Sequence, residues 1–133
     1  MLSHVTVGIT DFDRAMAFYR PIIARLGLKL RFEDATAPWA GWQPAEGDRP
    51  LFIIMRPLNG AAAAPGNGAM TAFAAPDRQT VEDAHALALS LGGADEGAPG
   101  LRPHYHASYY GAYFRDPDGN KLCVVCHAPE PGR

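Results

Sequence analysis

The chain has 133 residues, of which 47% are hydrophobic, and 12 basic against 14 acidic residues give it a net charge of −2. This length suits one domain with a single core, and the hydrophobic fraction argues against intrinsic disorder. This near-neutral balance removes the electrostatic case for binding to nucleic acid or to an anionic membrane surface, since both need a clustered basic patch. No apolar run approaches the length of a membrane span, so no transmembrane segment is predicted.

The N-terminal residues contain no basic stretch followed by an apolar segment, so no secretory signal is predicted. The chain has two cysteines, and without an export signal these are expected to be free thiols in a reducing compartment. We therefore expect a cytoplasmic protein.

The first half of the chain follows the order strand, helix, further strands. Val5–Ile9 alternates and is β-branched, which is typical of a half-buried strand. Asp11 can cap a following helix whose apolar residues recur at helical spacing. Pro21 lies inside that pattern and predicts a kink or a restart of the helix. Further strands are predicted at Leu28–Phe32 and Leu51–Met55.

The second half repeats this order after residues 59–68, a segment rich in Gly, Ala and Pro that is predicted to be an exposed linker. A strand is predicted first, and then a helix that ends at a pair of glycines. A strand, a tight turn and a returning strand complete the half. These elements are Met70–Ala75, the helix after Asp77, Tyr109–Phe114, the turn Asp116–Gly119 and Lys121–Cys126.

The two halves align with each other. Asp11 and Asp77 are 66 residues apart, and the equally long segments Gly47–Pro57 and Gly119–Pro129 are offset by 72 residues. Neither half could bury the apolar face of its sheet alone. We therefore expect one α+β domain over residues 1–133, built from two modules at approximately 2–58 and 69–128.

A duplicated βαβββ module that opens with His-Val-Thr-Val-Gly-Ile-Thr-Asp (residues 4–11) and closes with Asp-Pro-Asp-Gly-Asn-Lys-Leu (residues 116–122) resembles the vicinal oxygen chelate superfamily. This superfamily includes glyoxalase I, bleomycin-resistance proteins, fosfomycin-resistance enzymes and extradiol dioxygenases. The resemblance covers residues 2–127. It implies two βαβββ modules that form a curled mixed sheet around a shared cavity.

Enzymes of this superfamily typically hold a divalent metal with one side chain from the first strand and one from the last strand of each module. The resemblance places these positions at His4, Met70 and Cys123, and the fourth within residues 50–57, which contain no carboxylate. Of these, only His4 matches the ligand chemistry that such an ion prefers. We therefore expect no metal cofactor, with a bound divalent metal as the alternative.

Two polar residues lie next to predicted strands. His4 is expected on the strand face opposite Val5 and Val7. It is either a hydrogen-bonding group of a pocket or a remnant metal ligand, or else a polar residue satisfied by backbone or water. Arg56 follows an apolar strand, and its guanidinium either holds an anionic group at the cavity rim or extends into solvent.

Cys123 and Cys126 form a C-x-x-C motif, which is typical of redox or zinc sites when its local structure is suitable. In a strand, however, the two residues face opposite sides with Cα atoms about 10 Å apart, beyond the limit of about 7 Å for a disulfide. They are expected to be two unrelated buried thiols.

The segment His104-Tyr105-His106 is the densest polar and aromatic cluster in the chain. In a strand, its two histidines would share a face and could bridge a metal or an anionic substrate. The preceding Arg102-Pro103 favours a loop, which lies either at a cavity mouth or in solvent. Aromatic residues that either line a pocket or pack half-buried are Trp39, Trp42, Tyr109 and Tyr113.

These observations lead us to expect a glyoxalase-like protein that handles a small anionic or polar-aromatic molecule in the cavity between its modules. The alternatives are a metal-free binding or sequestering protein of the bleomycin-resistance type, and a metal-dependent lyase or dioxygenase. The resemblance also implies a homodimer, and exposed edge strands would need such cover. The candidate ligand-binding residues are His4, Arg56, Met70, His106, Tyr109, Tyr113 and Cys123.

Overall fold

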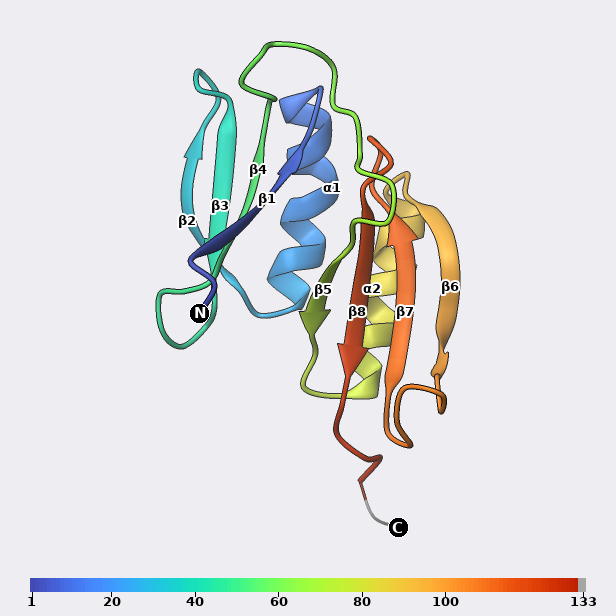
Figure 1. Cartoon of the computed structure of the whole chain (residues 1–133). Coiled ribbons are helices and arrows are strands. Elements are labelled where there is room, and N and C mark those ends of the chain that lie inside the picture. The colour runs from blue at the N-terminus through green and yellow to red at the C-terminus, as the bar shows by residue number, and fades with distance from the viewer. Residues whose placement is uncertain (132–133) are drawn as a thin grey trace.

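The computed structural model describes residues 1–131 and confirms an α+β fold with two βαβββ modules (Figure 1). Over these residues each module has one helix and a four-stranded mixed sheet, in the order β1-β4-β3-β2 in the first module and β5-β8-β7-β6 in the second. The first module contains β1 (His4–Gly8), α1 (Phe12–Arg25), β2 (Lys29–Asp34), β3 (Trp39–Gln43) and β4 (Leu51–Met55). The second contains β5 (Thr71–Ala74), α2 (Arg78–Ser90), β6 (Ala94–Leu101), β7 (Tyr110–Arg115) and β8 (Lys121–Cys126).

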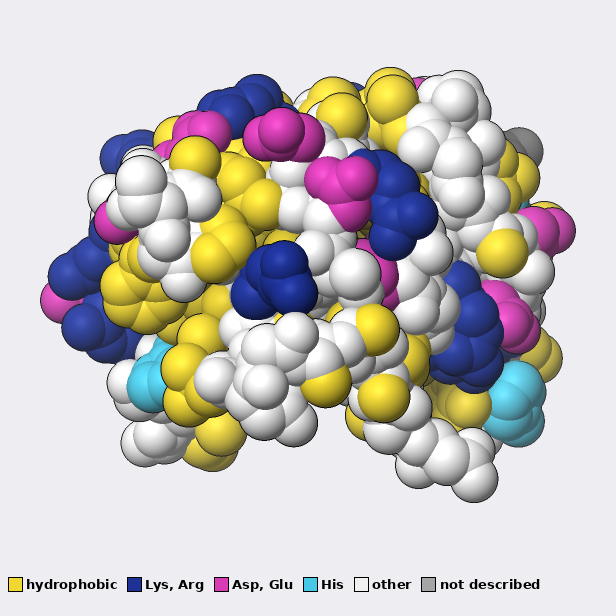
Figure 2. Space-filling model, turned by 90° about the horizontal axis from the view of Figure 1, so that it is seen from above, with side chains coloured by type: hydrophobic (Ala, Val, Ile, Leu, Met, Phe, Trp, Pro, Cys, Tyr) yellow, Lys and Arg dark blue, Asp and Glu magenta, His cyan; other side chains and the backbone are white. Residues whose placement is uncertain are grey.

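The helix α1 lies between the two sheets, and α2 covers one face of the second sheet (Figure 1). The ring of Phe18 on α1 meets Phe114 of β7 at a centroid distance of 6.2 Å, and that of Tyr19 meets Phe52 of β4 at 5.5 Å. One continuous core therefore joins both modules, as expected for a single cooperative unit. Seen from above, the molecule has two lobes, one for each module, and its outline is hollowed between them (Figure 2).

Each sheet has one face that packs against the helices and one that faces away from them, which we call the open face. Val5 and Val7 pack against the core, whereas His4 and Thr6 alternate with them on the open face and are exposed. This confirms the predicted alternation of β1.

The two cysteines also obey this alternation. Cys126 belongs to the core beneath the helices, whereas Cys123 lies on the open face of the second sheet. Both are buried and free, as predicted.

One local prediction needs correction, and two strands had no prediction. α1 runs from Phe12 to Arg25 without a restart at Pro21, because its packing against both modules outweighs the single backbone hydrogen bond that proline removes. The strands β3 and β6 were not predicted. β6 contains Pro99 and two glycines, but it is an edge strand with register shifts, where such residues are tolerated.

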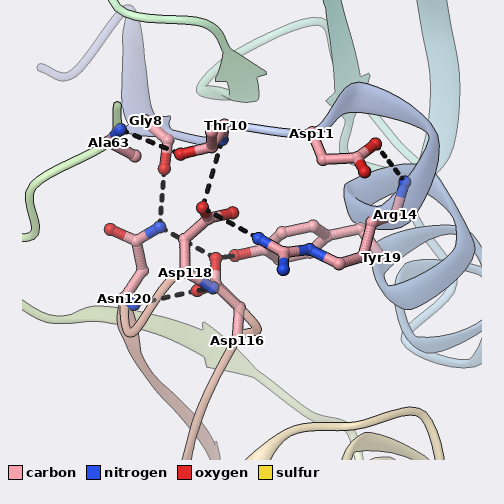
Figure 3. A network of polar contacts seen from close by, with 9 residues as sticks. All are labelled: Gly8, Thr10, Asp11, Arg14, Tyr19, Ala63, Asp116, Asp118 and Asn120. Atoms are coloured by element: carbon pink, nitrogen blue, oxygen red, sulfur yellow. Dashed lines mark hydrogen bonds and ion pairs between the residues drawn. The ribbon is translucent and has the colours of Figure 1, made fainter. Parts of the chain in front are cut away.

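A buried polar network joins the turn between β7 and β8 to the first module (Figure 3). Asp116 is 3% exposed and accepts hydrogen bonds from the hydroxyl of Tyr19 at 2.5 Å and from Nδ2 of Asn120 at 2.8 Å. Asn120 Nδ2 also donates to the carbonyl of Gly8 at 2.8 Å. The same turn is linked to the first module a second time through Asp118, which accepts from the backbone of Thr10 and from Arg14.

Candidate functional site

The structure separates the residues that the sequence singled out into two groups. His4 and Arg56 belong to the first module, where His4 is level with Leu51 at one end of β4 and Arg56 follows the other end. The two lie about 13 Å or more apart along the strand direction. Met70, His106, Tyr109, Tyr113 and Cys123 belong to the second module.

Neither residue of the first group meets the second group. His4 is exposed and contacts the hydroxyl of its neighbour Ser3 at 2.9 Å. Arg56 donates to the carbonyl of Gly60 at 3.2 Å and lines a separate hollow that also contains Asp11 and Asp13.

Three side chains meet on the open face of the second sheet. The hydroxyl of Tyr109 lies 2.8 Å from that of Tyr113 and 3.6 Å from Sγ of Cys123. The ring of Tyr109 covers Gly111, where an added Cβ would come within 2.8 Å of the ring. The glycine therefore makes room for the tyrosine that covers Cys123.

These three groups keep their protons at neutral pH. Burial and the hydrogen bond to Tyr113 raise the pKa of Tyr109 far above its usual range. Burial is also the main cause that raises the pKa of Tyr113 and of the Cys123 thiol. The cluster is therefore uncharged and offers hydroxyl groups rather than a thiolate.

The segment His104-Tyr105-His106 forms a turn, as the preceding Arg102-Pro103 indicates, so His104 and His106 do not share a strand face. His106 Nδ1 accepts from the backbone N–H of Ser108 at 3.1 Å, and its Nε2 lies 2.9 Å from His127 Nδ1. Neutral His106 therefore carries its proton on Nε2 and donates it to His127. Sequence reasoning missed His127, which directly follows the last strand.

A pocket of about 600 Å³, which we call the linker pocket, lies between the linker and the second sheet. Residues 65–70 form one wall, and the other consists of Tyr105, Tyr113, Arg115 and Lys121. Met70 and Tyr113 of the predicted set line this pocket. A smaller pocket of about 270 Å³ shares part of this lining and reaches residues 6–8 of β1, so it lies between the modules.

Sequence reasoning did not single out Arg115 and Lys121. Alternation gave a usable signal, because these residues face the same side as Tyr113 and Cys123 on their strands. The position of the linker over them depends on tertiary structure and has no local pattern.

Two βαβββ modules with mixed sheets, packed into one domain with pockets along the linker, define the class of this protein. The chain belongs to the Glyoxalase/Bleomycin resistance protein/Dioxygenase superfamily, whose family model matches residues 1–124.

Solved structures agree with this membership. A glyoxalase/bleomycin resistance protein from Albidiferax ferrireducens T118 is similar at 33% identity and a TM-score of 0.82, with 96% of this chain and 99% of that chain covered. A glyoxalase-related enzyme from Fulvimarina pelagi is 19% identical with a TM-score of 0.71, over 95% of this chain and 87% of that chain. A lactoylglutathione lyase from Agrobacterium tumefaciens is 20% identical with a TM-score of 0.64, over 95% and 92%. The last two likenesses show the fold alone, and no curated protein matches the chain.

The residues at the superfamily's metal positions do not fit a divalent ion within one chain. His4 lies on the first sheet, Met70 is 45% exposed beside the linker, and the Cys123 thiol is buried beneath a tyrosine hydroxyl. Zinc and harder ions need several oxygen, imidazole or thiolate ligands around one point. Among residues 1–131 no group of three or more His, Cys, Asp or Glu side chains is placed to hold a metal.

The two helices of the described chain are too short or too polar to cross a bilayer.

Proposed function

We propose that this protein binds a small organic molecule in the linker pocket and does so without a divalent metal. The observation that carries the proposal is the pocket itself, whose volume of about 600 Å³ is sufficient for such a ligand. Its lining combines the apolar side chain of Met70 and the ring of Tyr105 with the polar groups of β7 and β8. The lining is more polar than apolar, so the pocket suits a polar or charged ligand with a small apolar part.

The chemistry at the neighbouring Cys123 supports binding rather than metal-dependent turnover. The Tyr109 hydroxyl lies against the thiol, whose raised pKa keeps it protonated. The groups available here therefore donate hydrogen bonds but do not generate a metal-bound nucleophile. This favours a binding or sequestering protein of the bleomycin-resistance type over a metal-dependent lyase or dioxygenase.

We also propose a cytoplasmic location, which the two free buried thiols support.

Native mass spectrometry of the freshly purified protein, with elemental analysis, tests the metal-free part of the proposal. We expect less than stoichiometric metal. About one zinc, nickel, iron or manganese ion per chain that is lost in His4→Ala would contradict it.

Methyl-labelled methionine NMR tests the location of the site. The chain has four methionines, and Met70 lines the pocket, whereas Met16 is buried in α1 at 5% exposure. Compounds from a small-molecule screen should shift the Met70 methyl signal and leave that of Met16 in place. Binding that shifts only Met55, which lies on β4 of the first sheet, would place the site elsewhere.

A further inference from the structure

Three cationic side chains gather around Tyr113 on the open face of the second sheet. Nζ of Lys121 and Cζ of Arg102 each lie 5.5 Å from the centroid of the Tyr113 ring, and Arg115 lines the linker pocket with Lys121. Arg115 forms an ion pair with Glu96. Among residues 1–131, neither Arg102 nor Lys121 has an ion-pair partner, so two positive charges are uncompensated.

The strand register brings two of these charges together. Arg115 and Lys121 are direct cross-strand partners at the end of the β7–β8 hairpin. Like charges directly opposite each other destabilise an antiparallel pair. Glu96 offsets the charge of Arg115, so the uncompensated charge at the wall of the linker pocket is that of Lys121, and a bound anion would neutralise it.

The acidic residues of the adjoining turn do not neutralise Lys121. Asp116 is buried and occupied by Tyr19 and Asn120, and Asp118 accepts from Thr10 and Arg14 (Figure 3). Both carboxylates therefore serve the joint between the modules.

We infer that the linker pocket recognises the anionic end of its ligand, a doubly charged group such as a phosphate monoester or a phosphonate. Lys121 and Arg115 make the direct contacts, and Arg102 adds to the positive potential. The organic part of the ligand lies against Met70 and Tyr105, which line the same pocket. The inference rests on the proposed function and names the chemical class of its ligand.

Charge matching is the physical basis of this choice. Lys121 and Arg102 both carry uncompensated charge beside the Tyr113 ring, so the local positive potential favours a dianion over a monoanion. Nε and Nη1 of Arg115 already donate to Glu96 and to the carbonyl of Gly119, so its remaining amino group makes the contact with the anion. Arg56 is not part of this group, because its hollow contains Asp11 and Asp13, which disfavour an anion.

NMR titration of the full chain with phenyl phosphate, benzoate and benzyl alcohol tests the inference. These probes share an aromatic ring and differ in charge. We expect phenyl phosphate to bind at least about tenfold more tightly than benzyl alcohol, with benzoate between them, because each charge-assisted contact contributes on the order of a tenfold gain. The preference should weaken as salt is added.

The two lysines of the chain provide a matched pair of variants. Lys121→Met should weaken phenyl phosphate about tenfold and leave benzyl alcohol within about twofold. Lys29→Met, an exposed substitution on β2 of the other sheet, should change neither. Inorganic phosphate should raise the melting temperature of the wild type more than that of Lys121→Met.

The outcomes separate the inference from the proposed function. If all three probes shift the Met70 signal with equal affinity, or Lys121→Met binds phenyl phosphate as tightly as the wild type, the anion inference is wrong and the linker pocket stands. If no probe shifts the Met70 or Lys121 signals, the anion inference is wrong and the pocket proposal then depends on the wider screen.

Discussion

Cys123 shows how a single position in this fold acquires its chemistry. Alternation along the last strand is enough to place it on the face opposite Cys126, because the periodicity of a strand is local. Two tyrosine hydroxyl groups lie close to this thiol. Tyr113 is on β7 and Tyr109 directly precedes that strand, and the placement of the Tyr109 ring depends on the glycine at position 111. The face on which the Cys123 thiol lies can therefore be predicted from the sequence, whereas its cover by two tyrosine side chains cannot.

This cover leads to a prediction about thiol reactivity. In the native protein neither Cys123 nor Cys126 should react with a thiol-specific reagent at pH 8, because both are buried and burial raises the pKa of Cys123. Tyr109→Ala should expose Cys123 and make it react, while Cys126 stays protected beneath α2. Labelling followed by peptide mass spectrometry identifies the modified residue.

Tyr105→Phe is the control for this experiment, because Tyr105 is 61% exposed and the substitution keeps the ring that packs on Tyr109 at a centroid distance of 4.8 Å. It should leave both cysteines unreactive. Labelling of Cys126 before Cys123 in Tyr109→Ala would show general unfolding and contradict the local role of Tyr109.

At the scale of elements, the turn between β7 and β8 connects the modules. Its Asp116 and Asn120 are buried and meet α1 and β1, so the turn positions the first module on the second. The turn sequence predicts a tight hairpin from local chemistry alone. Its role as a joint cannot be predicted that way, because the partners Tyr19 and Gly8 are about a hundred residues distant.

Loss of this joint should be measurable as a loss of stability. Asn120→Ala leaves the carbonyl of Gly8 and one oxygen of Asp116 short of a donor, so we expect it to lower the free energy of unfolding by about 2 kcal/mol. Tyr19→Phe removes one hydrogen bond to Asp116 and should cost about 1–2 kcal/mol. Urea unfolding of both variants checks this, and equal stability to the wild type would contradict it.

Other elements show where sequence patterns suffice. Alternation predicts β1, a continuous apolar run predicts β4, the tight turn before it predicts β8, and helical spacing predicts both helices. β6 escapes prediction because its Gly and Pro residues are acceptable only at a sheet edge, and an edge is a property of the assembled sheet. The linker pocket escapes prediction for a similar reason. Its cations lie on predictable strands, but the opposite wall is a linker whose path has no sequence pattern.

At the scale of the whole molecule, tyrosine ionisation limits stability at alkaline pH. Burial is the first cause that raises the pKa of Tyr19, Tyr109, Tyr110 and Tyr113 in the folded state. In the unfolded state tyrosine loses its proton near pH 10. The stabilisation is therefore fully present below about pH 10 and is lost as the pH rises from there toward the folded-state values.

Urea midpoints measured from pH 8 to pH 11 should accordingly stay level to about pH 9.5 and then fall steeply. Absorbance at 295 nm should show that most of the five tyrosines ionise only when the protein unfolds. Complete reversible ionisation near pH 10 in the folded protein would contradict the burial of these groups.

The last prediction is that the protein forms a homodimer through the open face of its first sheet. α1 covers only the other face of this sheet, while Trp39 remains 38% exposed and packs against Phe32 at a centroid distance of 4.4 Å. Exposed aromatic surface of this kind is typical of an interface, and a net charge of −2 opposes association little.

Sedimentation at tens of micromolar should give twice the chain mass of 14.3 kDa. Trp39→Glu should shift the protein toward the monomer without loss of its circular dichroism spectrum. Leu89→Glu, at an equally exposed position on α2, should leave the dimer intact because that surface belongs to a helix outside the sheet face. A wild-type mass near that of one chain would show that the open face needs no second copy, and equal effects of the two variants would place the contact elsewhere.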